Sequence, residues 1–258
     1  MLTLYAVSGG AIFLYMVILF LAAQIKKDNS IVDIGWGMGF VIIAFVTFFY
    51  KDGFEPRQLL ILVLVTLWGV RLALHLLIRS IGRAEDFRYA NFRKEWGKNV
   101  VVIAFFRVFM LQGFFMLLLA YPIIRVNAEQ SGGLDAAAYV GFVIWAIGFL
   151  FQAVGDAQLE SFKKTRRSKE EVLTTGLWRY TRHPNYFGEA AMWWGIAVII
   201  LPVRGGWIAV FSALFMNLLL LKVSGVPFLD KRYAQNAAYQ QYKKETNRFL
   251  PWFPNKTQ

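Results

Sequence analysis

Residues 176–189 bring together side chains that suit phosphate or nucleotide chemistry. The segment contains two Arg, two Tyr, one His, one Asn and one Glu. Pro184 favours the first turn of a helix, and a helix N-terminus presents free N–H groups at the positive end of its dipole. With Arg179 and Arg182 close by, this pattern predicts a site for a nucleotide diphosphate or another phosphorylated cofactor. The alternative is a basic loop that binds lipid headgroups.

Asp33 is a carboxyl group in an apolar stretch, within the sequence Ile31-Val32-Asp33-Ile34-Gly35-Trp36-Gly37. No Lys or Arg lies within four residues of it. Ionisable groups at bilayer depth are costly and are usually retained for function. We expect burial to keep this carboxyl protonated, as a proton donor. The alternative is a helix cap or a carboxylate at the membrane interface.

Other ionisable residues fall at helical spacings. Arg71 and His75 are four apart and share one face of a helix, where they either line a polar cavity or extend toward the neighbouring loop. Arg107 lies inside another apolar stretch, as a packing partner or a ligand contact. After another apolar stretch, acidic and basic residues recur at helical spacings: Asp156, Glu160, Lys163 and Lys164. The default interpretation of such a stripe is a solvated helix face.

The elements that hold these residues are predicted to cross a membrane. Of the 258 residues, 57% are hydrophobic and only 17% are charged, which is too apolar for a soluble or disordered chain. A spanning helix needs about 20 apolar residues. Seven stretches qualify, and they predict one all-α integral membrane domain over residues 1–258: residues 3–24, 32–50, 58–78, 100–124, 135–155, 186–203 and 206–224.

The basic residues are distributed unequally between alternate loops. Of the 28 Lys and Arg, 22 fall in the first, third and fifth loops and the tail, and 4 in the other loops. The positive-inside rule therefore places the N-terminus outside and the C-terminus in the cytoplasm. This topology explains the net charge of +12, so no nucleic-acid partner is expected. With no Cys and two His, no metal site is expected either.

Several motifs resemble the steroid 5α-reductase family, and in particular its bacterial DUF1295 branch. Residues 176–189, followed by Trp193-Trp194-Gly195, resemble the family's C-terminal signature, which we place in residues 100–258. Further similar motifs are spread over most of the chain: Val32-Asp33-Ile34-Gly35-Trp36-Gly37, Trp68-Gly69-Val70-Arg71, Glu85-Asp86-Phe87-Arg88-Tyr89, Gly155-Asp156, Ser224-Gly225-Val226-Pro227, Tyr242 and Phe249-Leu250-Pro251.

The resemblance implies a seven-helix membrane reductase that uses NADPH, bound from the cytosolic side, to reduce a carbon–carbon double bond conjugated to a carbonyl. It places catalytic roles at Asp33 and Trp68, where steroid reductases carry a Gln-Glu pair and a Tyr. The acid is shortened here and the phenol is replaced. It places the cofactor contacts at the following residues, the last three by adjacency: Arg71, Gln152, Asp156, Lys163, Asn185, Glu189, Tyr180, Arg182 and His183.

The resemblance also implies a hydrophobic enone substrate, steroid-like or lipid-like, in contact with membrane lipid. No obligate protein partner is evident from the sequence. The expected location is the bacterial inner membrane, or the endoplasmic reticulum in a eukaryote. One rival is an S-adenosylmethionine-dependent methyltransferase, because isoprenylcysteine methyltransferases share the Arg182-His183-Pro184 element. Those enzymes carry a Glu-Glu pair that we would expect within residues 229–242, and this sequence lacks it. The other rival is a non-enzymatic lipid-binding membrane protein.

Overall fold

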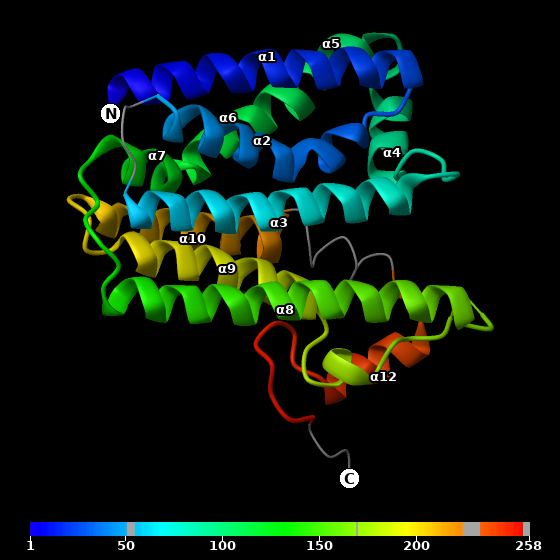
Figure 1. Ribbon diagram of the computed structural model, residues 1–258. Coiled ribbons are helices and arrows are strands. Elements are labelled where there is room, and N and C mark those ends of the chain that lie inside the picture. Colours follow the sequence, from blue (N-terminus) through cyan, green and yellow to red (C-terminus); the bar gives the residue numbers. More distant parts are fainter. Residues whose placement is uncertain (51–54, 169, 224–232, 255–258) are drawn as a thin grey trace. The chain divides into compact units, whose positions relative to one another are not determined.

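The computed structural model describes residues 1–50, 55–168, 170–223 and 233–254. Every regular element in these ranges is a helix (Figure 1), which confirms the all-helical prediction. The chain divides into two compact units: unit 1 comprises Met1–Leu134 and Ile200–Ile208, and unit 2 comprises Asp135–Ile199 and Ala209–Gln258. This division does not test whether residues 1–258 form the single membrane domain that we expect from the sequence, so that domain stays a prediction.

Among the residues that the structure describes, six helical segments are long and apolar enough to cross a membrane: Leu2–Lys26, Ile31–Phe48, Pro56–Ser80, Phe87–Leu119, Ala136–Thr165 and Gly206–Val223. The stretch expected at 186–203 forms α9 (Pro184–Ile200), which has 17 residues. At 1.5 Å per residue this helix is about 26 Å long, shorter than a hydrocarbon core of about 30 Å. The chain is therefore an integral membrane protein by its apolar helices, while seven spans and the orientation of the termini stay predictions.

Unit 1 is built around three long helices, α1 (Leu2–Lys26), α2 (Ile31–Phe48) and α3 (Pro56–Ser80). A continuous helical run follows, made of α4 (Phe87–Trp96), η1 (Gly97–Asn99), α5 (Val100–Ala104), the π-helical η2 (Phe105–Met110) and α6 (Leu111–Leu119). This run begins well before the stretch expected at 100–124, so Arg88 and Arg93 lie on a helix instead of in a loop. The unit is completed by α7 (Tyr121–Ala128) and η4 (Gly206–Ile208).

Glycine allows α2 and α3 to approach closely. A Cβ atom added to Gly37 would lie 2.6 Å from the Gly69 carbonyl oxygen, and one added to Gly69 would meet Gly37 in the same way. Small residues at such crossings are typical of helix packing in membranes. Beside the crossing, the fully buried rings of Phe40 and Trp68 pack with their centroids 5.4 Å apart.

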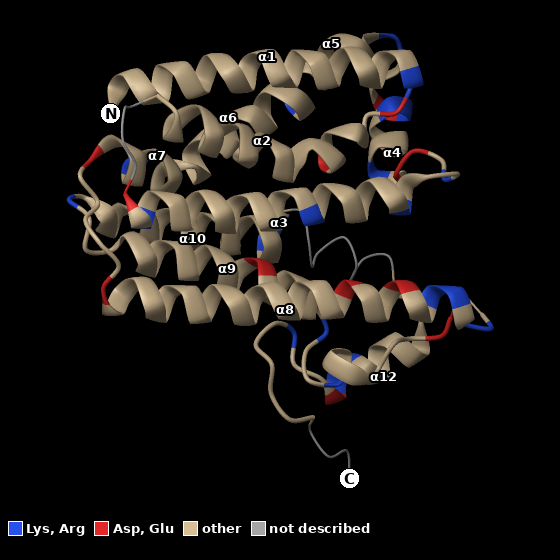
Figure 2. Ribbon diagram, in the orientation of Figure 1, with Lys and Arg blue, Asp and Glu red and all other residues tan. Residues whose placement is uncertain are grey.

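The two ends of unit 1 carry different numbers of basic residues. At one end the Asn29 N–H donates a 2.8 Å hydrogen bond to Glu85, which joins the α1–α2 turn to the α3–α4 turn. Lys and Arg cluster at this end, at the end of α1 and on α4 (Figure 2). At the other end Tyr121 donates to the Gly205 carbonyl at 2.7 Å. Unit 1 thus has the charge asymmetry from which the orientation was predicted.

Unit 2 contains α8 (Ala136–Thr165), η3 (Gly176–Arg179), α9, α10 (Ala209–Leu218), the π-helical η5 (Leu219–Val223) and α12 (Ala237–Glu245). Helices α8 and α9 are antiparallel and meet along glycines. Added Cβ atoms on Gly141 and Gly148 would lie 2.5 Å from the Gly195 carbonyl oxygen and 2.6 Å from that of Gly188. The glycines on each helix are seven apart, or about two turns, so they form one continuous seam.

Candidate functional site

A polar cluster lies along the seam of unit 2, at the end where α9 begins. Gln152 donates from its amide to the Glu189 carboxylate, and Asn185 donates to the Asp156 carboxylate at 3.0 Å. Trp193 donates from its indole nitrogen to the other oxygen of Glu189 at 3.4 Å. Four residues that the sequence assigned to a cofactor, Gln152, Asp156, Asn185 and Glu189, are therefore brought together on two adjacent helices.

The glycine seam explains why these four side chains meet. Glu189 follows Gly188, Asp156 follows Gly155, and Asn185 follows Pro184, which an added Cβ on Gly155 would approach to 3.2 Å. Each polar residue is thus next to a point where the two backbones are closest. Gln152, Asp156 and Glu189 are 4–6% exposed. Buried polar groups of this kind must be hydrogen-bonded to be tolerated, and the cross-helix pairs supply those bonds.

The loop before α9 is fixed to the same seam. Gly176 has φ +62°, a conformation that favours glycine, and it starts the short helix η3. The Trp178 indole donates to the Gly155 carbonyl at 3.0 Å, and the Tyr242 hydroxyl of α12 donates to the Trp178 carbonyl. Burial raises the pKa of the Tyr242 phenol, while the Arg182 charge acts in the opposite direction.

The three loop residues assigned to the cofactor by adjacency differ in exposure. Arg182 and His183 are 7% and 1% exposed, whereas Tyr180 is 37% exposed. The His183 ring stacks on Tyr186 of α9, with centroids 5.4 Å apart and planes at 14°. Arg182 and His183 are therefore part of the buried side of the loop, and Tyr180 lies on its surface.

Lys163 lies about two turns beyond Asp156 on α8, within the expected acidic and basic stripe. It forms a 2.8 Å ion pair with Glu160, and Figure 2 shows carboxylates followed by basic residues toward the C-terminal end of this helix. The pair is partly exposed, so it contributes little to stability. Lys163 is on the same continuous helix as Gln152 and Asp156, and it extends the charged face of that helix.

Asp33 lies in unit 1, near the start of α2, and its surroundings differ from the expectation. Arg88 is 55 residues later in the sequence, and its guanidinium is 2.7 Å from the Asp33 carboxylate. Tyr89 donates its hydroxyl to the other carboxylate oxygen at 2.7 Å and accepts a 3.3 Å hydrogen bond from Gln112. Asp33 therefore has a cationic partner and two hydrogen-bond donors that come from a helix distant in the sequence, while its role as a proton donor stays a prediction.

Arg88 is itself held by the start of α4. Asp86 is the N-cap of that helix, accepting from the Arg88 N–H at 3.0 Å and from its guanidinium at 2.8 Å. Burial alone would raise the pKa of Asp86, but the hydrogen bonds and charge of Arg88 hold it below its ordinary value. The sequence marked residues 85–89 only as a motif. Neither the Arg88–Asp33 pair nor the Tyr89 contact could be found from local spacing.

The other two predicted site residues of unit 1 lie on α3. Trp68 is 2% exposed and packs on Phe40 beside the Gly37–Gly69 crossing, so it closes the α2–α3 interface. Arg71 is half-buried on the same helix, less than one turn later. Both residues lie in unit 1, as Asp33 does, whereas the other residues that we predict to contact the cofactor lie in unit 2.

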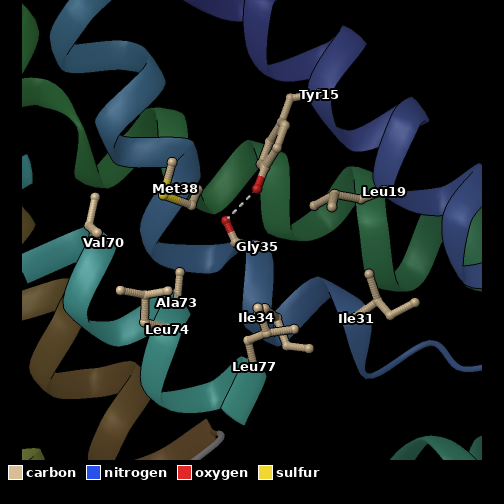
Figure 3. Close-up of a pocket in the computed structure, with 10 residues that line it drawn as sticks. All are labelled: Tyr15, Leu19, Ile31, Ile34, Gly35, Met38, Val70, Ala73, Leu74 and Leu77. Carbon is tan, nitrogen blue, oxygen red and sulfur yellow. Dashed lines mark hydrogen bonds between the residues drawn. The ribbon is translucent and has the colours of Figure 1, made fainter. Parts of the chain in front are cut away.

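A largely apolar cavity of about 340 Å³ also lies in unit 1, between α1, α2 and α3 (Figure 3). Its polar edge is Tyr15, whose hydroxyl donates to the Gly35 carbonyl at 3.0 Å. On α2 the lining residues Ile31, Ile34, Gly35 and Met38 share one face. At 100° per residue, Asp33 lies on the opposite side of that helix, so this cavity does not include the predicted acid.

No group of three or more His, Cys, Asp or Glu residues suited to a metal ion occurs among the described residues. The Ser224–Pro227 motif, and residues 229–232 of the segment compared with methyltransferases, lie outside the described ranges.

The fold and the buried cluster define an all-helical integral membrane protein with a polar site formed on two antiparallel helices. The family model described as "Protein of unknown function (DUF1295)" matches residues 19–246. The chain belongs to this family.

Individual relatives are more distant. An uncharacterised protein of Schizosaccharomyces pombe is 26% identical over 65% of this chain and 56% of its own length. The human protein named 3-oxo-5-alpha-steroid 4-dehydrogenase 1 is 30% identical over 32% of each chain. A probable O-methyltransferase of Ustilaginoidea virens is 27% identical over 48% of this chain and 43% of its own. The chain thus covers between about a third and just over half of the length of these relatives.

Proposed function

We propose that the protein is an NADPH-dependent membrane reductase of a carbon–carbon double bond conjugated to a carbonyl, acting on a hydrophobic, steroid-like or lipid-like substrate. The observation that carries this proposal is the buried cluster of Gln152, Asp156, Asn185 and Glu189. The similarity to 3-oxo-5-alpha-steroid 4-dehydrogenase 1 supports an oxidoreductase of this kind. The apolar helices support a substrate that partitions into the membrane.

The donor set of the cluster fits a nicotinamide nucleotide. Each ribose hydroxyl donates one hydrogen bond and accepts others, and the carboxamide does both. Two carboxylates, Asp156 and Glu189, accept, while the amides of Gln152 and Asn185 donate and accept. These side chains are already aligned in cross-helix pairs. The basic groups suited to phosphates in unit 2 are Arg182 and Lys163, with Tyr180 and His183 as further proposed contacts. The assignment of Arg71, which belongs to unit 1, rests on the family resemblance alone.

When bound, the cofactor supplies the hydride that adds to the β-carbon of the enone, and the α-carbon takes the second hydrogen as a proton from water. The protein's part is to stabilise the negative charge that then develops on the carbonyl oxygen. We assign this to the Asp33 cluster: Asp33 positions the Arg88 guanidinium, a group with five N–H donors, and Tyr89 donates its one O–H to Asp33 and so holds the carboxylate in place. Loss of one such donor typically costs about 10²–10³ in rate. We assign Trp68 a supporting role, in which its buried ring packs on Phe40 beside the α2–α3 crossing and keeps these two helices in place.

Binding measurements on the protein in lipid nanodiscs test this proposal. NADPH should raise the thermal unfolding midpoint of the wild type and leave that of Glu189→Ala much less changed. Gln241→Ala is the matched control, because Gln241 is an exposed polar residue of α12 away from the cluster. The partial similarity to a probable O-methyltransferase makes S-adenosylmethionine the comparison ligand. Stabilisation by S-adenosylmethionine and not by NADPH would refute the proposal.

A further inference from the structure

The segment 247–254, which we call the strap, lies against the loop before α9. The Arg182 N–H donates to the Asn247 carbonyl at 2.9 Å, and the Thr181 hydroxyl donates to the Phe249 carbonyl at 2.8 Å. The Trp252 N–H donates to the Tyr180 carbonyl at 2.9 Å. Three consecutive loop residues are therefore each bonded to the strap, which fixes the loop's backbone.

The strap has one buried and one exposed side. Phe249 faces inward, with its ring centroid 6.2 Å from that of Phe187 on α9. Leu250, Trp252 and Phe253 are 66%, 68% and 73% exposed. Such a concentration of large apolar side chains on a short segment marks an interaction surface. Pro251 and Pro254 flank the aromatic pair, and their fixed φ angles limit its freedom.

The residues around this surface are of the type found where lipid meets water. Tyr180 extends the aromatic surface, its ring centroid 6.0 Å from that of Phe253. Arg179 and Arg248 are exposed beside it. Trp and Tyr are enriched at the level of lipid headgroups, and Arg pairs with phosphate. In contrast, the neighbouring Arg182 is buried, so the loop presents one Arg outward and keeps the other inside.

The position of the strap is consistent with this chemistry. It is bonded to residues 180–182, directly before the first turn of α9. The loop that the strap holds is bonded to α8 at Gly155, whose carbonyl accepts from the Trp178 indole, and Gly155 lies about 30 Å from the start of α8 at 1.5 Å per residue, close to the thickness of a hydrocarbon core. Helix α8 has 30 residues, about 45 Å at 1.5 Å per residue, so its last turns extend past a hydrocarbon core of about 30 Å.

We infer that the strap inserts Leu250, Trp252 and Phe253 into the lipid–water interface, with Arg179 and Arg248 on lipid phosphates, and that this contact holds the loop 176–183 in place. The partner is the bilayer itself. The loop is the one that the proposed function assigns to the cofactor, but the contact with lipid stands without that assignment.

The absence of Cys from the sequence allows a direct test. A nitroxide spin label is attached to Leu250→Cys, and as a matched control to Gln241→Cys on the exposed face of α12, in phosphatidylcholine and phosphatidylglycerol nanodiscs. The label at 250 should be relaxed by oxygen and shielded from a water-soluble nickel chelate, whereas the label at 241 should show the reverse. Equal access of the nickel chelate to both labels would overturn the inference.

A second experiment tests whether the strap holds the loop 176–183 in place. Trypsin should cut at Arg179 on the order of tenfold faster in the double variant Trp252→Ser/Phe253→Ser, because cleavage follows the population of the open loop. Trp252→Phe, which keeps an aromatic ring, should be cut at the wild-type rate. An unchanged rate in the double variant would show that the strap does not hold the loop. Neither readout needs NADPH, so failure of the proposed function would leave both results intact.

Discussion

The Asn185 amide donates a 3.0 Å hydrogen bond to the Asp156 carboxylate, 29 residues earlier, on the helix that runs antiparallel to its own. The pair lies at one end of a seam in which glycine permits the two backbones to approach. One turn further along the seam, Gln152 and Glu189 repeat the arrangement with the amide and the carboxylate exchanged between the helices.

Removal of the Asn185 amide should weaken NADPH binding and also lower the thermal midpoint. Asn185→Ala removes a proposed cofactor contact, and one neutral hydrogen bond contributes about 0.5–1.5 kcal/mol, or about 2- to 12-fold in the dissociation constant; it also removes the Asn185 donor from the buried Asp156 carboxylate. Isothermal titration with NADPH in nanodiscs measures the change. Gln241→Ala, an exposed amide, should bind as the wild type does. Equal affinities in Asn185→Ala and the wild type would remove Asn185 from the site.

Enlargement of a seam glycine should disturb the cluster without touching any polar group. A side chain on Gly148 would meet the Gly188 carbonyl and the Met192 N–H, and overpacking typically costs about 1–3 kcal/mol. We expect Gly148→Val to lower the thermal midpoint and to weaken NADPH binding together. Gly10→Val on α1 is the control, because nothing lies within 4 Å of an added Cβ there. A midpoint equal to that of Gly10→Val would contradict the close seam.

Replacement of Asp33 should separate turnover from cofactor binding. Asp33→Asn keeps the shape but loses the charge that orients Arg88 and Tyr89, so we expect a loss of about 10²–10³ in rate with an enone and an unchanged dissociation constant for NADPH. Glu95→Gln, an exposed carboxylate on α4, should change neither quantity. Equal loss of cofactor affinity in Asp33→Asn and Asn185→Ala would show that Asp33 is not on the substrate side.

The Asp86 cap should make stability depend on pH in a defined direction. The pKa of Asp86 is lowered in the folded state, so its contribution is present above the unfolded value of about 3.9 and is lost as pH falls through the folded value. Asp86→Asn keeps a side chain that can cap the helix but loses the ion pair with Arg88, so it should be less stable than the wild type at pH 6 by about 0.2–1 kcal/mol. Thermal unfolding at falling pH should bring the two midpoints together. A difference between the two midpoints that grows as the pH falls would contradict this prediction.

The sequence predicted which side chains of the C-terminal cluster meet, but not those of the N-terminal one. Gln152, Asp156, Asn185 and Glu189 were assigned to the cofactor from the family motifs, and the structure brings these side chains together on α8 and α9, while their role stays a prediction. Asp33 was interpreted from its neighbours in sequence, where no base occurs. Its partner Arg88 comes from a helix 55 residues away, and no local pattern carries that contact.

The strap was missed for a similar reason. The tail motif around Phe249 was noted in the sequence, but the hydrogen bonds to residues 180–182 depend on tertiary contact. The span expected at 186–203 was predicted from hydropathy alone. Helix α9 is much more buried than α1, and a helix that is apolar all round can be a buried helix as well as a spanning one.

Transfer of isotope is the most direct test of the proposed reduction. The purified protein in nanodiscs is given NADPH deuterated at the transferred position of its nicotinamide ring, together with a 3-oxo-Δ4-steroid and a lipid-linked enone, and the products are analysed by mass spectrometry. The proposal predicts a saturated product with one deuterium at the β-carbon, reduced in amount in Asp33→Asn and Asn185→Ala. Substrate returned without deuterium, together with transfer of a labelled methyl group from S-adenosylmethionine in a parallel reaction, would contradict it.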